Sequence, residues 1–263
     1  MKPVIVIKYG GNAMSDSAAD RCFAREVLSI QSAGFTPLIV HGGGPHINYW
    51  LSRLGKKPVF IEGMRVTDEE TMAIVEMVLS GHVNKALVSA FNQVGAKAIG
   101  LSGKDAYIIR AKPYQGHVTL GQVGEVSAIA PEPIRTLLEN QFIPIIAPIG
   151  VGTAGQSFNI NADSVASHLA QVFSAEMLLL LTNTPGVLDA QGRLIAKLEL
   201  HMIEQMLAQG TIHGGMIPKL TAARQALQHG VKAVRIIDGR GQQALVQQVL
   251  SKASLGTALC CEA

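Results

Sequence analysis

The sequence predicts an α/β fold, a three-layer α/β/α sandwich around a mostly parallel, open β-sheet, with two lobes. Two observations lead to this prediction. Short apolar runs alternate with stretches of helical periodicity along the chain. Within the runs, consecutive residues are apolar, which is typical of strands covered by helices on both faces. With 263 residues, the chain is long enough to bury such a core.

The first part of the chain holds four apolar runs and four helical stretches. Strands are expected at 4–8, 37–41, 97–103 and 142–150, and helices near 17–33, 45–54, 67–95 and 131–140. Thr67 has a capping-box spacing to Glu70, so the third helix should begin at Thr67. Residues 106–128 alternate in polarity and are rich in turn residues, which predicts antiparallel hairpins there.

The same alternation continues in the second part. Strands are expected at 177–182 and 231–237, and helices near 161–173, 199–209, 219–229 and 241–251. Asn161 is placed to cap the first of these helices, with Asp163 at its second position. A soft boundary near 173–176 divides the chain into lobes of residues 1–175 and 176–263.

Composition excludes several classes of protein. Apolar residues make up 48% of the chain and charged residues 16%, a balance that favours doubly covered strands and a buried subunit interface. No apolar run approaches the roughly 20 residues that span a bilayer, and no signal peptide is visible, so we expect a cytoplasmic protein without membrane contact. The net charge of +3 comes from scattered basic residues, which does not support nucleic-acid binding.

The three cysteines point to the same compartment. Cys22, Cys260 and Cys261 have neither the spacing of metal ligands nor that of a disulfide framework. We therefore expect free thiols in a reducing environment and no metal held by cysteine.

Glycine clusters follow the first two predicted strands. Gly10-Gly11 comes after the first, and "LIVHGGGPHI" places Gly42-Gly43-Gly44 after the second. Ligands of open α/β sheets bind beyond the carboxyl ends of the strands, so the two clusters could form one site. A glycine turn of this kind serves either as the oxyanion hole of an esterase or as a cradle of amides for phosphate.

Missing motifs decide between these chemistries. The chain has no G-x-S-x-G nucleophile elbow, so Ser102 and Ser157 have no claim to be nucleophiles. It also lacks the G-x-x-x-x-G-K-[ST] phosphate loop, since Asp105 follows Gly103-Lys104, and no strand is followed by G-x-G-x-x-G. A glycine-lined anion site with separate lysines remains.

Two lysines and one carboxylate are candidates for that site. Lys8 ends an apolar strand directly before "YGG", and Lys219 opens a helix behind Gly214-Gly215, where a cation opposes the helix dipole. Asp163 could hold both lysines in place. Asn159 lies just before the helix that contains Asp163 and would be free to bind a ligand. The alternatives are a strand-end lysine reaching solvent, an ordinary surface lysine and an aspartate that serves only its own helix.

At these residues the chain resembles the amino acid kinase superfamily, and within it the N-acetylglutamate kinase branch. The resemblance covers the whole length, in order and spacing. It rests on "KYGGNAM", "VHGGGP", "EGMRVTDEETMAIVEMVLSGHVNKALV", "GLSGKD", "NINADSVA", "LTNTPGVL" and "GGMIPK". "HGGG" and "NINAD" are shared with sister kinases, whereas "GMRVTD" followed by "VNK" is more specific.

The resemblance implies the amino acid kinase fold and phosphoryl transfer from ATP with Mg²⁺ to the γ-carboxylate of N-acetyl-L-glutamate. It assigns amino-acid binding and dimerisation to residues 1–175 and nucleotide binding to 176–263. Lys8 and Lys219 would be the catalytic cations, oriented by Asp163. The implied phosphate-binding residues are Gly10, Gly11 and Gly44, the substrate-binding residues Gly43, Gly44, Arg65 and Asn159, and the nucleotide-binding residues Asn183, Thr184, Gly186, Val187, Leu188, Thr211, Gly214, Gly215 and Met216.

The chemistry of carboxylate phosphorylation agrees with these roles. A carboxylate is already nucleophilic at neutral pH, so cations and amides that offset charge repulsion are sufficient. Mg²⁺ would bridge nucleotide phosphates with few protein ligands, in keeping with a sequence that has no acidic cluster. Asn183 stands where relatives often carry Asp, which puts a contact to ribose or adenine in doubt. Nothing in this chemistry needs an imidazole, so His41, His46 and His213 are interpreted as structural.

Two other functions remain open at this point. One is a sister kinase that acts on another carboxylate, such as aminoadipate on a carrier protein. Glu62, Asp68, Glu69 and Glu70 around Arg65 argue instead for a small free amino acid. The other is a regulatory module that binds an amino acid without turnover, and the presence of both lysines with Asp163 argues against it.

Oligomeric state is predicted from residues 71–81. This stretch carries one charge, Glu76, is too apolar for an exposed helix, and lies where the resemblance places a dimer contact. We therefore expect a homodimer. Arginine-sensitive relatives carry a further N-terminal helix, whereas the first strand here begins by Pro3 or Val4, so we expect no feedback inhibition by arginine.

Overall fold

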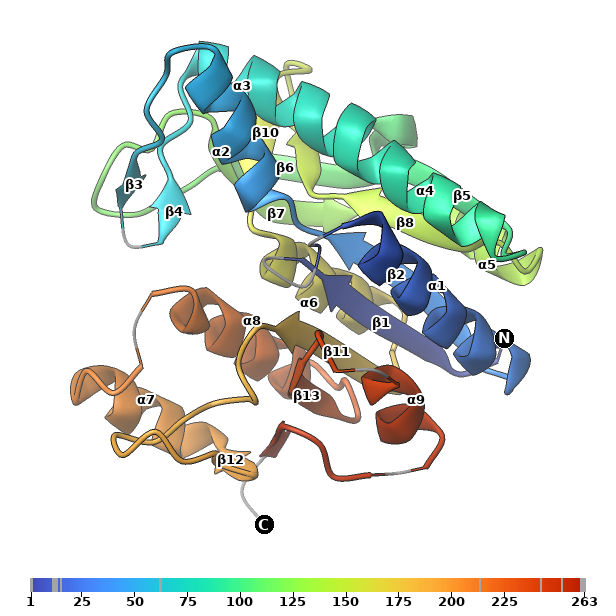
Figure 1. Cartoon of the computed structure of the whole chain (residues 1–263). Helices are drawn as coiled ribbons and strands as arrows, with labels where there is room; N and C mark the ends of the chain where they lie inside the picture. The colour runs from blue at the N-terminus through green and yellow to red at the C-terminus, as the bar shows by residue number, and fades with distance from the viewer. Residues whose placement is uncertain are drawn as a thin grey trace.

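The computed structural model describes residues 2–10, 14, 16–61, 63–212, 214–241, 243–251 and 253–260. Eight strands within these ranges form one sheet (Figure 1). In spatial order they are β12 (Lys197–Glu199), β14 (Thr257–Cys260), β13 (Val234–Asp238), β11 (Met177–Thr182), β1 (Val4–Tyr9), β2 (Thr36–His41), β8 (Ile143–Ala147) and β5 (Ala98–Ser102). Only β13 and β14 pair antiparallel, so the predicted, mostly parallel sheet is confirmed.

Both faces of the central strands are buried. In β1, Val4 and Val6 belong to the hydrophobic core on one side of the sheet, and Ile5 and Ile7 to the core on the other. Successive side chains of a strand point to opposite faces, so only a continuous apolar run can serve both cores. This explains why the central strands are recognised in the sequence as runs of consecutive apolar residues.

Helices cover the two faces and complete three layers (Figure 1). One face carries α1 (Ser17–Ser32), α2 (Gly44–Arg53), α3 (Glu69–Glu76), α4 (Asn84–Gln93) and α9 (Ala244–Val249). The other carries α5 (Glu132–Glu139), α6 (Ala162–Val172), α7 (Leu200–Ala208) and α8 (Met216–Gln228). The predicted sandwich is therefore confirmed.

The predicted helix over 67–95 differs from the structure at its start and in its middle. Asp68, and not Thr67, is the N-cap: its Oδ1 accepts from the N–H of Thr71 at 2.8 Å, and the Thr67 hydroxyl instead donates to the carbonyl of Arg65. The predicted capping box, with Thr67 as the N-cap, is therefore wrong. The next residue, Asp68, is also a favoured N-cap and takes that position instead. Between α3 and α4, η2 (Met77–Val83) is π-helical.

The predicted strand over 142–150 is two strands. After β8, Pro148 separates β9 (Ile149–Val151), which leaves the main sheet for a small closed barrel with β6 (Ile109–Pro113), β7 (Val123–Ile129) and β10 (Ser157–Ile160). β6 and β7 pair antiparallel, as predicted for residues 106–128. A further hairpin, β3 (Phe60–Ile61) and β4 (Met64–Arg65), stands beside the barrel, and η3 (Asp105–Tyr107) is a single 3₁₀ turn.

The apolar stretch 71–81 is mostly accounted for within one protomer. Met72, Val75, Val78 and Leu79 are at most 2% exposed and belong to the core beneath α3. Met77, at 55%, is the exposed large side chain of the stretch. The argument that this helix needs a partner to cover its apolar residues is therefore wrong, and Met77 is the large apolar side chain of the stretch that a partner could still cover.

Two further observations concern membrane-spanning helices and the cysteines. No described helix combines the length and the apolar character that crossing a membrane requires. Cys22 and Cys260 are free thiols, and Cys261 lies outside the described residues.

Candidate active site

Two cavities open where β1 and β2 end. The larger has a volume of about 590 Å³ and the smaller about 260 Å³. Lys8, Gly44, Gly63, Asn161 and Asp163 line both, so the cavities meet at these residues. The carboxyl ends of parallel strands are where α/β sheets bind ligands, as the glycine clusters predicted.

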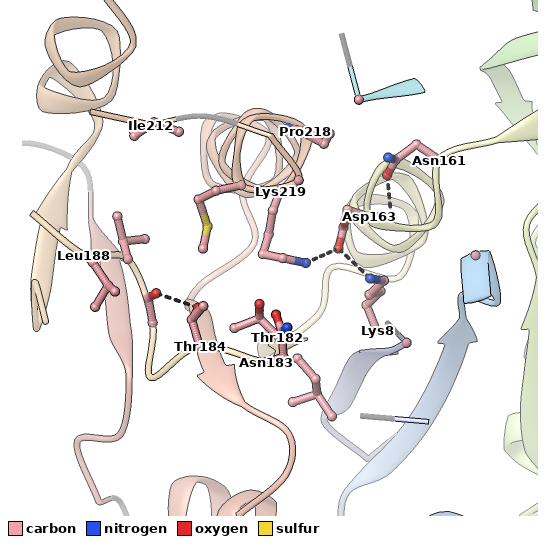
Figure 2. A pocket seen from close by; sticks show the side chains of 18 of the residues that line it. Lys8, Asn161, Asp163, Thr182, Asn183, Thr184, Leu188, Ile212, Pro218 and Lys219 are labelled. Atoms are coloured by element: carbon pink, nitrogen blue, oxygen red, sulfur yellow. Dashed lines mark hydrogen bonds and ion pairs between the residues drawn. The ribbon is translucent and has the colours of Figure 1, made fainter. Parts of the chain in front are cut away.

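Lys8, Asp163 and Lys219 form a buried ion cluster at this junction (Figure 2). The Nζ atoms of Lys219 and Lys8 lie 2.8 Å and 3.4 Å from the same oxygen, Oδ1 of Asp163. The three residues are 9% exposed or less and come from β1, α6 and α8. Two cations on one carboxylate leave a net positive charge facing both cavities, which an anionic ligand would offset.

The pKa values in the cluster follow from burial and charge. Burial, aided by the charge of Lys8 and opposed by Asp163, lowers the pKa of Lys219 to about 8. Burial alone would raise the pKa of Asp163, but the charges of Lys219 and Lys8 outweigh it and hold that pKa below its ordinary value. The carboxylate is therefore ionised at neutral pH, and Lys219 is a cation that can lose its proton under mildly basic conditions.

Local structure places each member of the cluster. Asn161 caps α6, as predicted, and its Oδ1 accepts from the N–H of Asp163 at 2.8 Å and of Ser164 at 3.3 Å. Lys219 lies in the first turns of α8, which begins at Met216, three residues before the predicted start. A cation there is unfavourable for the helix dipole, so Asp163 offsets a cost that the position imposes.

The larger cavity collects most of the predicted nucleotide and phosphate residues. Those lining it are Gly10, Gly44, Asn183, Thr184, Gly186, Val187, Leu188, Thr211, Gly215 and Met216. Gly214 is adjacent in sequence but is not part of the lining, and Gly11 and His213 lie outside the described residues. Side-chain hydrogen bonds help to hold the loop after β11: the Thr184 hydroxyl donates to the Gly186 carbonyl, and the Val187 N–H donates to Oγ1 of Thr257.

The smaller cavity holds Gly43, Gly44, Arg65 and Asn159, the predicted substrate residues. Arg65 is 6% exposed, and its Nη2 donates to Oδ1 of Asn48 at 2.6 Å and to the Gly44 carbonyl at 3.3 Å. Its Nη1 is buried without a hydrogen-bond partner. Burial lowers the pKa of Arg65 to about 10, so the guanidinium is still charged at neutral pH. A buried cation with a free donor fits an incoming carboxylate.

Sequence reasoning missed three residues that hold Arg65 and Asn159 in place beside the smaller cavity. Phe60 stacks on the guanidinium of Arg65, with its ring centroid 4.7 Å from Cζ. Asn48 accepts from Arg65, and Thr67 accepts from Nδ2 of Asn159 at 3.1 Å while donating to the Arg65 carbonyl. Asn48 and Thr67 lie within or beside the motifs "VHGGGP" and "GMRVTD", but only the tertiary fold shows what they contact.

None of the acidic residues that the structure describes near Arg65 forms an ion pair with it. Asp68 and Glu70 both bind Lys56, at 2.6 Å and 2.9 Å, and Glu62 lies outside the described residues. The guanidinium therefore keeps its charge available to a ligand.

A dedicated metal cage is absent from the described ranges. No three His, Cys, Asp or Glu side chains gather there. A divalent cation that reaches this site bound to nucleotide phosphates would keep most of its ligands on phosphate and water, which suits Mg²⁺.

The family follows from comparison with known proteins. A model of the amino acid kinase family matches residues 3–238. The chain belongs to this family. Two of its most similar relatives are named acetylglutamate kinase: one from Aromatoleum aromaticum, 53% identical over 96% of this chain and 87% of the relative, and one from Methylobacillus flagellatus, 53% identical over 96% and 89%.

Solved structures share the fold. The protein smu.665 from Streptococcus mutans superposes with a TM-score of 0.84 at 35% identity, over 90% of this chain and 96% of that one. Carbamate kinase from Giardia lamblia bound to AMP-PNP gives a TM-score of 0.71 at 18% identity over 99% of both chains. N-acetylglutamate synthase from Neisseria gonorrhoeae, in complex with coenzyme A and N-acetyl-glutamate, gives 0.87 at 20% identity, over 99% of this chain and 60% of that one.

Proposed function

We propose that this kinase transfers a phosphoryl group from ATP to the γ-carboxylate of N-acetyl-L-glutamate, giving N-acetyl-L-glutamyl 5-phosphate and ADP in arginine biosynthesis. One observation carries the proposal: the ion cluster of Lys8, Asp163 and Lys219 lies where two cavities meet. Two substrates could therefore place their reacting groups against the same pair of cations. The relatives named acetylglutamate kinase supply the choice of acceptor.

Each cavity suits one substrate. The larger, at about 590 Å³ and lined mainly by residues after 176, accommodates ATP. The smaller has the size of an amino acid and contains Arg65, whose planar guanidinium would bind the α-carboxylate. Asn159 and the amides of Gly43 and Gly44 would hold the rest of the acceptor. We accordingly assign amino-acid binding to the lobe of residues 1–175 and nucleotide binding to that of 176–263.

The reaction needs no general base. An oxygen of the γ-carboxylate attacks the γ-phosphorus in line, forming a C–O–P link, while the bond to the β,γ-bridging oxygen breaks and its electron pair leaves with ADP. Two anions repel each other as they approach, and negative charge builds on the phosphoryl oxygens. Lys8 and Lys219 offset both effects, and Asp163 keeps their ammonium groups on the reaction axis.

Mg²⁺ would enter as part of the MgATP substrate. It would neutralise the β- and γ-phosphates, a task for which this chain offers no cluster of three acidic or histidine side chains within the described residues. The protein's own contribution is binding, orientation and the two lysines.

The decisive assay measures ADP release over a panel of acceptors. N-acetyl-L-glutamate should support turnover, with L-glutamate, carbamate and α-aminoadipate as controls, and hydroxylamine should trap the acyl phosphate product. Turnover with another carboxylate alone would indicate a sister kinase. Binding of an amino acid without ADP release would indicate a regulatory module.

We further propose a cytoplasmic homodimer. β5 ends the sheet, but side chains of Asn92, Lys85 and Asp105 already bond to backbone groups of this strand, so a second copy would pack against this edge through side chains. Met77, the first residue of η2, is 55% exposed and lies in the segment where the resemblance places a dimer contact.

A further inference from the structure

A buried polar pair lies directly behind the glycine run and lines neither cavity. His41 is the last residue of β2, Asn84 is the first of α4, and both are 0% exposed. Burying an imidazole and an amide is costly unless their polar atoms are hydrogen-bonded. The reaction described above uses neither side chain, so their presence needs another explanation.

The contacts of Asn84 distinguish the oxygen of its side-chain amide from the nitrogen. Lys85 Nζ, which can only donate, lies 3.1 Å from Oδ1. Nδ2 donates to the carbonyl of Ile145 at 2.9 Å and lies 3.1 Å from Nε2 of His41. Because the amide nitrogen is a donor, Nε2 of His41 must accept and carries no proton.

The imidazole proton therefore sits on Nδ1. Burial lowers the pKa of His41 to about 4, so the ring is neutral at neutral pH and carries one proton. With Nε2 accepting from Asn84, Nδ1 donates to the carbonyl of Gly42 at 2.8 Å. Asn84 thus selects the tautomer that can hold this carbonyl.

Both backbone polar groups of Gly42 are then engaged. Its N–H donates to the carbonyl of Tyr9 at 2.8 Å, and its carbonyl accepts from His41. In a planar trans peptide the carbonyl and the following N–H point in opposite directions, so the N–H of Gly43 points away from the ring of His41. Gly42, Gly43 and Gly44 line the smaller cavity, where the acceptor is expected.

We propose that His41 is a positioning residue for the phosphoryl transfer: its Nδ1–H, held by Asn84, fixes the Gly42 carbonyl and thereby aims the Gly43 amide at the substrates. The inference rests on the proposed function for what the amide would bind. Three consecutive glycines have unusual backbone freedom, so a run meant to present amides needs a restraint from outside. His41 and Asn84 supply it from two different elements.

The packing beneath this pair shows how α4 comes close enough. A Cβ at Gly100 in β5 would lie 1.9 Å from Oδ1 of Asn84, so only glycine leaves room for the side chain there. Lys85 Nζ also donates to the Gly100 carbonyl at 2.9 Å, which fastens the start of α4 to the strand.

The tautomer is the first test, on the unmodified protein. Side-chain ¹⁵N NMR of histidine-labelled enzyme should show His41 with a protonated Nδ1 and a bare Nε2 from pH 6 to 8. The assignment uses His41→Asn, in which the signal disappears. A ring protonated at Nε2 would overturn the proposal.

Two substitutions of His41 separate positioning from packing. Asparagine places an amide near the position of Nδ1 and can still donate to Gly42, whereas glutamine places its amide near Nε2 and keeps the contact to Asn84 only. We expect His41→Gln to lower kcat about tenfold to a hundredfold, the range for a misplaced catalytic group, with smaller changes in KM. His41→Asn should retain more kcat than His41→Gln even if its Tm is lower. Equal kcat values, or kcat that tracks Tm, would overturn the proposal.

A matched pair on α4 tests the role of Asn84. Asn84→Asp cannot donate to Nε2, so the ring should transfer its proton to Nε2 and turn a lone pair toward the Gly42 carbonyl. Asn92→Asp makes the same change on the same helix, where Oδ1 accepts from the N–H of Ala98, and does not touch His41. We expect lower kcat and a changed ¹⁵N signature in Asn84→Asp alone; an equal loss in Asn92→Asp would show a general effect on α4.

These outcomes separate the positioning role from the proposed function. If the unmodified enzyme phosphorylates N-acetyl-L-glutamate but the two His41 variants have equal kcat, the positioning role is wrong and the function stands. If it releases no ADP with that acceptor, the proposed function is wrong, while the tautomer measurement still decides whether His41 holds Gly42.

Discussion

A single carboxylate oxygen organises the candidate active site. Oδ1 of Asp163 lies 2.8 Å from Lys219 and 3.4 Å from Lys8, so the two cations are held closer together than their repulsion would otherwise favour. Both lysines and the aspartate were predicted from their neighbours in sequence, because a cation at the end of an apolar strand or at the start of a helix is costly unless an anion is near. That they share one oxygen depends on three elements meeting and could not be predicted from the sequence.

The first prediction concerns the lysines. Lys219→Ala and Lys8→Arg should each lower kcat far more than they raise KM for either substrate. Lys219→Ala loses charge stabilisation that is strongest in the transition state, which costs about 3 kcal/mol, on the order of a hundredfold in rate. Lys8→Arg keeps the charge but places it on a longer, planar group that is no longer in the position of the ammonium. Steady-state kinetics with circular dichroism to confirm folding would check this, and a variant with near-normal kcat would remove that lysine from the reaction.

The second prediction follows from the pKa of Lys219. Burial lowers this pKa to about 8, and the lysine acts as a cation, so its active form exists below that pH. In a profile of kcat/KM, which reports the free enzyme, activity should fall as pH rises through about 8. Lys219→Arg keeps its charge there, so its activity, although lower, should lack this fall. The same fall in Lys219→Arg would assign the titration to another group.

The third prediction concerns Arg65. Lysine cannot keep the guanidinium's bonds to Asn48 and the Gly44 carbonyl while offering a second nitrogen to a carboxylate, and it cannot stack on Phe60 in the same way. Arg65→Lys should therefore raise KM for N-acetyl-L-glutamate about tenfold or more, with little change in KM for ATP. An unchanged acceptor KM would exclude Arg65 from the substrate site.

The positioning role proposed for His41 goes beyond the structural interpretation that its sequence allowed. The sequence showed a histidine beside a glycine run and no reaction that needs an imidazole. Its contact to Asn84 spans 43 positions of sequence, and neither the tautomer nor its effect on Gly42 can be inferred without that contact. Phe60, Asn48 and Thr67 were missed for the same reason.

At the scale of elements, the N-terminus of α6 carries both stability and function. Asn161 caps the helix and thereby fixes the turn that bears Asp163. Asp16 caps α1 in the same way, accepting from the N–H of Ala18 and Ala19, but it lines neither cavity. The two caps therefore form a natural comparison.

The fourth prediction uses this comparison. Asn161→Ala and Asp16→Ala should each destabilise the protein by about 1 kcal/mol, the usual cost of losing an N-cap. Only Asn161→Ala should also lower kcat, because only it loosens Asp163. Urea unfolding and kinetics on both variants would check this, and equal kcat values would show that the cap does not position the carboxylate.

Long apolar elements were predictable, and short ones were not. The buried central strands and the helices between them stood out because both cores impose a continuous pattern. β10, β12 and β14 have three or four residues and mixed polarity, so no period could reveal them. The break at Pro148 was hidden for the opposite reason: β8 and β9 are both apolar, although they belong to different sheets.

At the scale of the whole molecule, the surface that we propose for a second copy is formed by β5 and η2. Most apolar residues of 71–81 are buried in the protomer's own core, so their hydrophobicity alone no longer argues for a second subunit. What remains is the edge strand β5 and an exposed Met77 on η2, a segment that contacts β5.

The fifth prediction is that this surface joins two copies. Light scattering should give about twice the chain mass of 27.8 kDa. Met77→Arg would place a charge in a contact that excludes water, where an unpaired charge is costly, and should shift the mass toward the monomer. Met202→Arg is the control, because Met202 is 37% exposed on α7, which lies on the opposite face of the sheet. A monomeric unmodified protein, or equal masses for both variants, would show that the copies do not meet through this surface.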